Sequence, residues 1–161
     1  MTIAVGATLP SVSFKYFEGD EFKEGSTDQL FQGRKVVLFA VPGAFTPTCS
    51  VRHLPGFLEQ AAALKAKGVD AIVVTAVNDP FVFRAWLKDT GATDTLTPLP
   101  DGNATLATAL GLTLDGSGFG LGTRSQRYSL IAEDGVVTWL AVEPNPAELT
   151  VASAEEVLKA L

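Results

Sequence analysis

Two long, mainly apolar runs constrain the fold of this chain more than any other feature: KVVLFAV at residues 35–41 and VDAIVVTAV at residues 69–77. Both are rich in β-branched residues, which is typical of strands buried inside a sheet. Between them, residues 49–67 carry apolar side chains at three- and four-residue steps, which predicts a helix that ends at Gly68. A buried strand, a helix and a second buried strand predict an α/β sheet.

The rest of the chain predicts further elements around this unit. We expect strands at residues 11–17, 126–132 and 136–142, and helices at residues 26–31, 78–91, 104–111 and 153–161. The EDG sequence between the last two strands is a hairpin signal, so the sheet should be mixed, with helices on both faces. Pro55 and Gly56 predict a kink in the helix at 49–67. The sequence shows no repeat, linker or low-complexity tract, so we expect residues 1–161 to form one domain.

Composition excludes several classes of function. The net charge of −6 and the absence of a basic cluster oppose binding to nucleic acid or to an anionic membrane. The first ten residues lack the features of a signal peptide, and no apolar run is long enough to span a bilayer. A single cysteine forms no intrachain disulfide, so we expect a cytoplasmic location. One cysteine and one histidine offer too few ligands for zinc, and we expect no metal.

The segment FAVPGAFTPTCSVRHLPGF, residues 39–57, contains the only cysteine of the chain, Cys49. Cys49 falls in the first turn of a predicted helix, where free N–H groups and the helix dipole favour a thiolate. The Thr46 hydroxyl lies three residues earlier and can donate a hydrogen bond to the sulfur or to a bound oxygen. Pro42 and Pro47 stiffen the loop, and together with Phe45 they offer apolar surface that excludes water. The segment therefore favours a reactive thiol.

Other interpretations of the same residues remain open at this point. A lone cysteine is more often a small buried hydrophobic residue than a nucleophile, and the domain would then be a binding module with an inert thiol. His53 lies four residues after Cys49, and a Cys–His pair on one helix face would activate a nucleophile for acyl transfer. A single histidine near a proline is more often structural, however, and no G-x-S-x-G motif or third triad member accompanies the pair.

The P-x-x-x-T-x-x-C pattern at residues 42–49 resembles the active-site loop of the peroxiredoxins. The longer motif VPGAFTPTCSxxHLPGF is similar to that of the type II subfamily, the atypical or peroxiredoxin-5-like proteins. The similarity continues through EQAAALKAKGVDAIVVTAVND (59–79) and RSQRYSLIAEDGVVTWLAVEP (124–144). It implies a thioredoxin-like fold, no metal or organic cofactor, and reduction of hydrogen peroxide and alkyl hydroperoxides.

The resemblance also implies roles for individual residues. Cys49 corresponds to the peroxidatic cysteine, which peroxide oxidises to a sulfenic acid. Thr46 would hydrogen-bond the peroxide and the thiolate, and Pro42 would shield the site. The invariant arginine of the family corresponds to Arg127, with Arg124 as second choice; without the resemblance, Arg127 would be interpreted as an exposed arginine in a surface ion pair. Further candidates for the substrate pocket are Phe45, Pro47 and His53.

Val74 stands where some type II relatives carry a second, resolving cysteine, and Val151 stands where others do. The chain therefore resembles the single-cysteine type, in which an external thiol reduces the sulfenic acid. We expect glutathione, with or without glutaredoxin, as first choice and thioredoxin as second. The alternative is a peroxide sensor or relay, in which Cys49 passes its oxidation to a partner protein through a mixed disulfide.

Type II relatives pair as homodimers through faces near the active site, and the resemblance implies the same here. Phe45, Phe81 and Phe83 are candidates for that face, with core packing as the equal alternative. Trp86 and Trp139 are assigned to the core.

Overall fold

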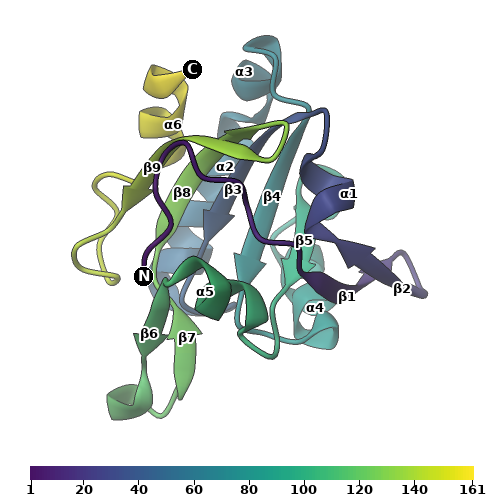
Figure 1. Ribbon diagram of the computed structural model, residues 1–161. Coiled ribbons are helices and arrows are strands. Elements are labelled where there is room, and N and C mark those ends of the chain that lie inside the picture. The colour runs from purple at the N-terminus through teal and green to yellow at the C-terminus, as the bar shows by residue number, and fades with distance from the viewer.

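A five-stranded sheet lies at the centre of the computed structural model, which describes residues 1–161 (Figure 1). The strand order is β5-β4-β3-β8-β9, with bounds of Thr97–Pro100, Ala71–Ala76, Lys35–Ala40, Tyr128–Glu133 and Val136–Val142. β3, β4 and β5 are parallel, whereas β8 and β9 run antiparallel to their neighbours. The predicted mixed sheet is confirmed.

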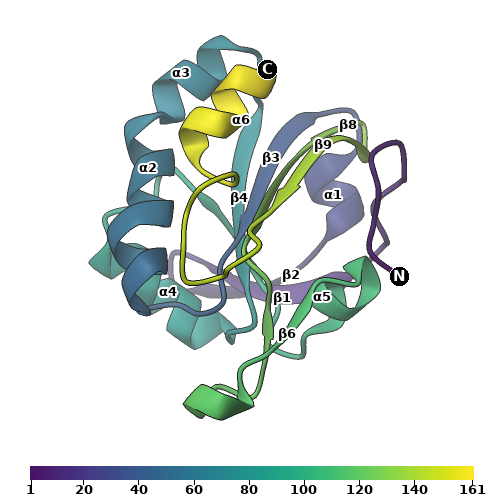
Figure 2. The same cartoon turned by 90° about the vertical axis from the view of Figure 1, so that its left-hand side faces the viewer.

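Helices cover both faces of this sheet (Figure 2). One layer contains α2 (Leu54–Glu59), α3 (Ala61–Ala66), α4 (Pro80–Asp89) and α6 (Ala154–Ala160), and the other contains α1 (Thr27–Phe31) and α5 (Thr105–Leu110). Successive residues of β3 point to opposite layers: Val37 and Phe39 to the first, Val36 and Leu38 to the second. β3 is therefore buried on both faces, which explains the lack of polar alternation in its sequence.

Local sequence signals explain several boundaries. The turn between β8 and β9 has Asp134 at φ 50° and Gly135 at φ 77°, as the predicted tight hairpin requires. The side chain of Ser153 accepts a hydrogen bond from the backbone N–H of Glu156 at the start of α6. Asp79 caps α4 in the same way. The helices predicted at residues 26–31, 78–91, 104–111 and 153–161 are thus confirmed.

Four strands and one short helix were not predicted from the sequence. The strand predicted at 11–17 is β1 (Ser13–Glu18), and it pairs with an unpredicted strand β2 (Glu21–Ser26). β5 contains Pro98 and Pro100, which argue against a strand except at a sheet edge, where β5 lies. The other unpredicted elements form a small hairpin: β6 (Thr113–Asp115), the 3-10 turn Ser117–Phe119 and β7 (Thr123–Ser125).

The helix predicted at residues 49–67 is divided differently from the prediction. It begins with a π-helical turn, Cys49–His53, in which the N–H of Leu54 donates to the carbonyl of Cys49. Pro55 has no N–H, and its ring would collide with the preceding turn of a regular α-helix, so a wider turn accommodates it. The predicted kink at Pro55 and Gly56 thus lies just before Pro55, and a second break at Gln60 separates α2 from α3.

No helix of the structure combines the length and the apolar character needed to cross a membrane.

Candidate active site

The loop after β3 places Cys49 at the start of the helical segment that leads into α2. The backbone N–H of Ser50 donates to the carbonyl of Thr46 over 3.0 Å, so Cys49 lies in the first helical turn, as predicted. Its side chain is 0% exposed and belongs to the core cluster beneath α2, α4 and α6. Burial alone would fit an inert core cysteine, so the polar contacts of the sulfur decide its chemistry.

Arg127 provides the decisive contact. It lies just ahead of β8, is 2% exposed, and its Nη2 donates to the Sγ of Cys49 over 3.0 Å. The fold thus brings together two residues that are 78 positions apart in the sequence. The alternative of an exposed arginine in a surface ion pair is wrong for Arg127.

The other nitrogens of Arg127 have neutral acceptors. Nε donates to the carbonyl of Pro146 over 2.9 Å, and Nη1 contacts Nδ1 of His53 over 2.9 Å. Arg127 takes no part in any ion pair with a carboxylate. A buried cation without a counterion is costly, and among its acceptors only the sulfur of Cys49 can become negatively charged. The sulfur of Cys49 is therefore the one acceptor at which a negative charge would face Arg127 directly.

His53 is held as a neutral imidazole behind Arg127. Its Nε2 lies 2.9 Å from the carbonyl oxygen of Ala152, which only accepts, and its Nδ1 faces a guanidinium, which only donates. Both contacts are satisfied only when the proton is on Nε2. Burial, together with the nearby charge of Arg127, lowers the pKa of His53 to about 3. Both ring nitrogens are engaged by Ala152 and Arg127, so neither is free to accept a proton from Cys49.

This arrangement predicts that His53 makes the protein sensitive to acid. The unfolded chain takes up a proton at the ordinary histidine pKa of 6.5, whereas the folded chain does so only near 3. The stability from neutral His53 is therefore complete above about pH 6.5 and is lost as the pH falls toward 3, by about 1.4 kcal/mol per pH unit. Urea unfolding across this range measures the slope.

The control for this prediction is His53→Gln, because a glutamine amide both donates and accepts but does not titrate. The difference in slope between the two proteins reports His53 alone. Equal slopes in both proteins would contradict the neutral, buried state of His53.

The loop residues predicted from the sequence differ in burial and in hydrogen bonding. Pro42 is buried, whereas Pro47 is exposed at the start of the helix. The hydroxyl of Thr46 donates to the carbonyl of Gly43 over 2.7 Å, so its proton is engaged by the loop rather than by the sulfur. Phe45 is half exposed and has a backbone φ of 66°, a left-handed conformation that costs about 1–3 kcal/mol and is typical of functional sites.

Arg124, the second-choice arginine, lies beside the same loop. Its Nε donates to the carbonyl of Leu121 over 2.9 Å, and its Nη1 lies 3.1 Å from the position that a Cβ on Gly43 would occupy. Of the two arginines, Arg127 is therefore the one that contacts the sulfur.

The remaining candidates divide between core and surface. Val74 is buried in β4, and Val151 is partly exposed on the segment that leads to α6. Phe83 belongs to the core, which excludes it from a subunit interface, whereas Phe81 is exposed. Trp86 is buried as predicted, but Trp139 is only half buried against the core.

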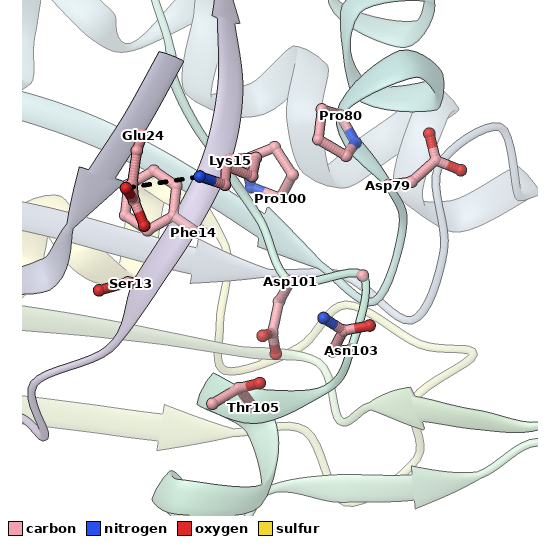
Figure 3. Close-up of a pocket in the computed structure, with 11 residues that line it drawn as sticks. Ser13, Phe14, Lys15, Glu24, Asp79, Pro80, Pro100, Asp101, Asn103 and Thr105 are labelled. Atoms are coloured by element: carbon pink, nitrogen blue, oxygen red, sulfur yellow. Dashed lines mark ion pairs between the residues drawn. The ribbon is translucent and has the colours of Figure 1, made fainter. Parts of the chain in front are cut away.

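A polar hollow of about 320 Å³ lies elsewhere on the molecule (Figure 3). Its charged groups already have partners: Lys15 pairs with Glu24 at 3.4 Å, and Asp101 accepts from the N–H groups of Leu106 and Ala107. No group of three or more histidine, cysteine or acidic side chains is placed to hold a metal ion.

The contacts that sequence reasoning missed are mostly made by the backbone. The carbonyl groups of Pro146 and Ala152 hold Arg127 and His53, and no sequence pattern identifies an acceptor that every residue possesses. The residue that organises this segment, Glu143, is visible in the sequence only as a single acidic residue at the end of a predicted strand.

Comparisons with known proteins agree with this geometry. Residues 4–158 match the Redoxin family. The chain is 54% identical to rice (Oryza sativa subsp. japonica) Peroxiredoxin-2E-2, chloroplastic, over 99% of this chain and 73% of that protein. It is 50% identical to rice Peroxiredoxin-2C over 99% and 98%. The crystal structure of reduced Prx3 from Vibrio vulnificus in complex with H2O2 superposes with a TM-score of 0.92 at 50% identity, over 99% of this chain and 96% of that one.

The resemblance in the cysteine loop therefore extends through the entire fold, and the predicted thioredoxin-like α/β architecture is confirmed. With relatives at this identity over nearly the full chain, the family is established. The chain belongs to the type II peroxiredoxins, the thiol peroxidases that reduce peroxides through a cysteine.

Proposed function

We propose that Cys49 is the peroxidatic cysteine and that it reduces hydrogen peroxide and alkyl hydroperoxides with the help of Arg127. The observation that carries this proposal is the 3.0 Å contact between the Sγ of Cys49 and a buried guanidinium that has no carboxylate partner. A thiolate is the nucleophile that peroxide chemistry requires, and the counterion favours it.

In the proposed reaction, the thiolate sulfur attacks one peroxide oxygen in line with the O–O bond. The S–O bond forms as the O–O bond breaks, so the sulfur is oxidised to a sulfenic acid and the second oxygen leaves as alkoxide or hydroxide. That oxygen takes up a proton from solvent, equal to the one released when the thiol ionised, and departs as alcohol or water. Negative charge moves from the sulfur to the leaving oxygen, and we propose that Arg127, which contacts the sulfur, stabilises the charge at both positions.

The loop ahead of Cys49 supplies the remaining roles in this proposal. Pro42 keeps water from the sulfur, and the oxygen of Thr46 accepts a hydrogen bond from the peroxide while its own proton is held by Gly43. Because Cys49 is 0% exposed, a covering group must move before peroxide reaches the sulfur. We propose that the loop at Phe45, whose side chain is half exposed, is the segment that moves.

An external thiol then reduces the sulfenic acid. The chain has no second cysteine for this step. The resemblance to type II relatives implies that Val74 stands where some of them carry one and Val151 where others do. One thiol forms a mixed disulfide with Cys49 and releases water, and a second thiol breaks that disulfide to restore Cys49. We propose glutathione, with or without glutaredoxin, as the reductant and thioredoxin as the second choice.

Steady-state peroxide consumption tests the choice of reductant. We expect sustained turnover with glutathione, faster turnover when glutaredoxin is added, and slower turnover with thioredoxin. The three reductants are compared at equal thiol concentration, with reductant alone as the control. Turnover with thioredoxin that exceeds both glutathione conditions would reverse the assignment.

The single cysteine also favours a second function, a peroxide sensor or relay. A sulfenic acid with no resolving cysteine in its own chain survives long enough for a partner thiol to intercept it. The same assay separates the two functions. A relay consumes one equivalent of peroxide per thiol and stops with each of the three reductants, whereas an enzyme continues.

The proposal treats residues 1–161 as one domain that works as a homodimer in the cytoplasm, where reduced glutathione is abundant. The Redoxin match over residues 4–158 supports the single domain. The exposed aromatic side chains of Phe45 and Phe81 are the candidates for the dimer face.

A further inference from the structure

Glu143 is a buried carboxylate that the proposed reaction does not use. It follows β9 directly and is 3% exposed. Its oxygens accept hydrogen bonds from the hydroxyl of Thr150 over 2.7 Å and from the backbone N–H groups of Thr150, Val151 and Ala152 over 2.7 to 2.9 Å. One side chain therefore fixes three consecutive residues of the segment before α6.

The fixed segment is connected directly to the active-site arginine. The carbonyl of Ala152 accepts from Nε2 of His53, and Nδ1 of His53 accepts from Nη1 of Arg127. A second connection runs through the backbone, where the N–H of Glu143 donates to the carbonyl of Arg127 over 2.9 Å. The same segment also supplies the carbonyl of Pro146 that accepts from the Nε of Arg127. Figure 2 shows this segment, between β9 and α6, running beside α2.

We propose that Glu143 is a positioning residue for the peroxide reaction: through Ala152 and His53 it holds the guanidinium of Arg127 against the sulfur of Cys49. The proposal rests on the function proposed above for Arg127. Glu143 touches neither the sulfur nor the peroxide, so its effect passes entirely through the arginine.

The hydrogen bonds that the Glu143 side chain accepts from residues 150–152 require a carboxylate. Burial acts to raise the pKa of Glu143, but the hydrogen bonds from Thr150, Ala152 and Val151 outweigh it and lower the pKa below its usual value, so the group is ionised at neutral pH. All the partners of its two oxygens are donors, as an ionised carboxylate requires. A glutamine in its place would turn an NH₂ group toward some of those donors, and the segment would have to shift to avoid them.

The test compares Glu143→Gln with Glu148→Gln in the full-length protein. Glu148 is an exposed carboxylate on the same segment, and its side chain makes no hydrogen bond or ion pair within the protein. Two quantities are measured: the rate of Cys49 oxidation by hydrogen peroxide in a single turnover, and the ¹⁵N NMR signals of the imidazole. His53 is the only histidine of the chain, so the NMR signals belong to it without ambiguity.

We expect Glu143→Gln to slow oxidation by about 10- to 100-fold, because a small misplacement of a catalytic group has an effect of this size. We also expect its imidazole signals to change from those of a fixed Nε2–H tautomer to those of a tautomer mixture. Glu148→Gln should match the wild type in both measurements.

Three results would overturn the proposal. The first is an unchanged rate in Glu143→Gln, and the second is a slower rate with the wild-type imidazole signals, since the effect would then bypass His53. The third is an equal loss of rate in Glu148→Gln. If the wild type itself does not reduce peroxide, the proposed function fails, whereas the imidazole signals still report whether Glu143 holds His53.

Discussion

Cys49→Ser is expected to reduce peroxide turnover to the rate measured without protein, a loss of at least about three orders of magnitude. The substitution exchanges a single atom, so the side chain still fits its buried site. In the proposed mechanism the nucleophile is a thiolate, and a serine hydroxyl is a much weaker nucleophile that does not replace it. The chain has no other cysteine that could take over the reaction.

The same substitution should also change stability, because in the proposed mechanism it removes the anion that faces Arg127. The guanidinium would keep its bonds to Pro146 and His53 but lose its charged partner. We expect Cys49→Ser to lower the free energy of unfolding by about 1–3 kcal/mol at neutral pH. Urea unfolding measures this loss alongside the peroxide assay.

Val51→Ser is a suitable control for both measurements. Val51 lies two residues after Cys49 in the same π-helical turn, but its side chain is exposed. A serine there should leave turnover and stability close to those of the wild type. Substantial peroxide turnover by Cys49→Ser would contradict the proposed mechanism, because the chain has no other cysteine.

The sequence predicted those elements whose signals lie within a few neighbouring residues. Buried strands such as β3 and β4 are continuous apolar runs, and α6 begins at a capping residue, Ser153. The position of Cys49 in the first turn of a helix followed in the same way from the strand, the loop and the helical periodicity around it. Each of these predictions needed only local information.

The elements that were missed depend on pairing between distant segments. β5 is a strand because it lies against β4, although its two prolines argue against a strand when it is considered alone. The π-helical turn at Cys49–His53 depends on a balance between Pro55 and the packing around the helix, which sequence periodicity does not record. Both outcomes are set by tertiary contacts that override local preference.

The candidate site shows the same division between residues with local sequence signals and residues that depend on contacts between distant segments. The cysteine and its loop are contiguous in the sequence, whereas Arg127 reached the prediction only through resemblance to a family. Its contacts cross the fold to His53 and to the carbonyl of Pro146, and such contacts leave no local pattern. The contacts of His53 with Arg127 and with the carbonyl of Ala152 likewise leave no local pattern.

Arg127→Gln is expected to slow the single-turnover oxidation of Cys49 by hydrogen peroxide about 10²- to 10³-fold, the usual effect of removing one group that stabilises developing charge. Two effects combine. The thiolate loses the counterion 3.0 Å from its sulfur, and the leaving oxygen loses the cation that would receive its charge. Alkylation of Cys49 by iodoacetamide at neutral pH should slow as well, because it also requires a thiolate but has no peroxide to orient.

Arg124→Gln tests whether the reaction depends on general positive charge near the site or on direct contact between an arginine and the sulfur of Cys49. Arg124 carries the same charge and lies against the same loop, but it bonds to Leu121 instead of the sulfur. If general positive potential drove the reaction, both substitutions would slow it similarly, because potential extends over several ångströms. If direct contact drives it, Arg124→Gln retains most of the rate and Arg127→Gln does not. A wild-type rate in Arg127→Gln with a severe loss in Arg124→Gln would show that Arg124 is the catalytic arginine, and the 3.0 Å contact would then be structural.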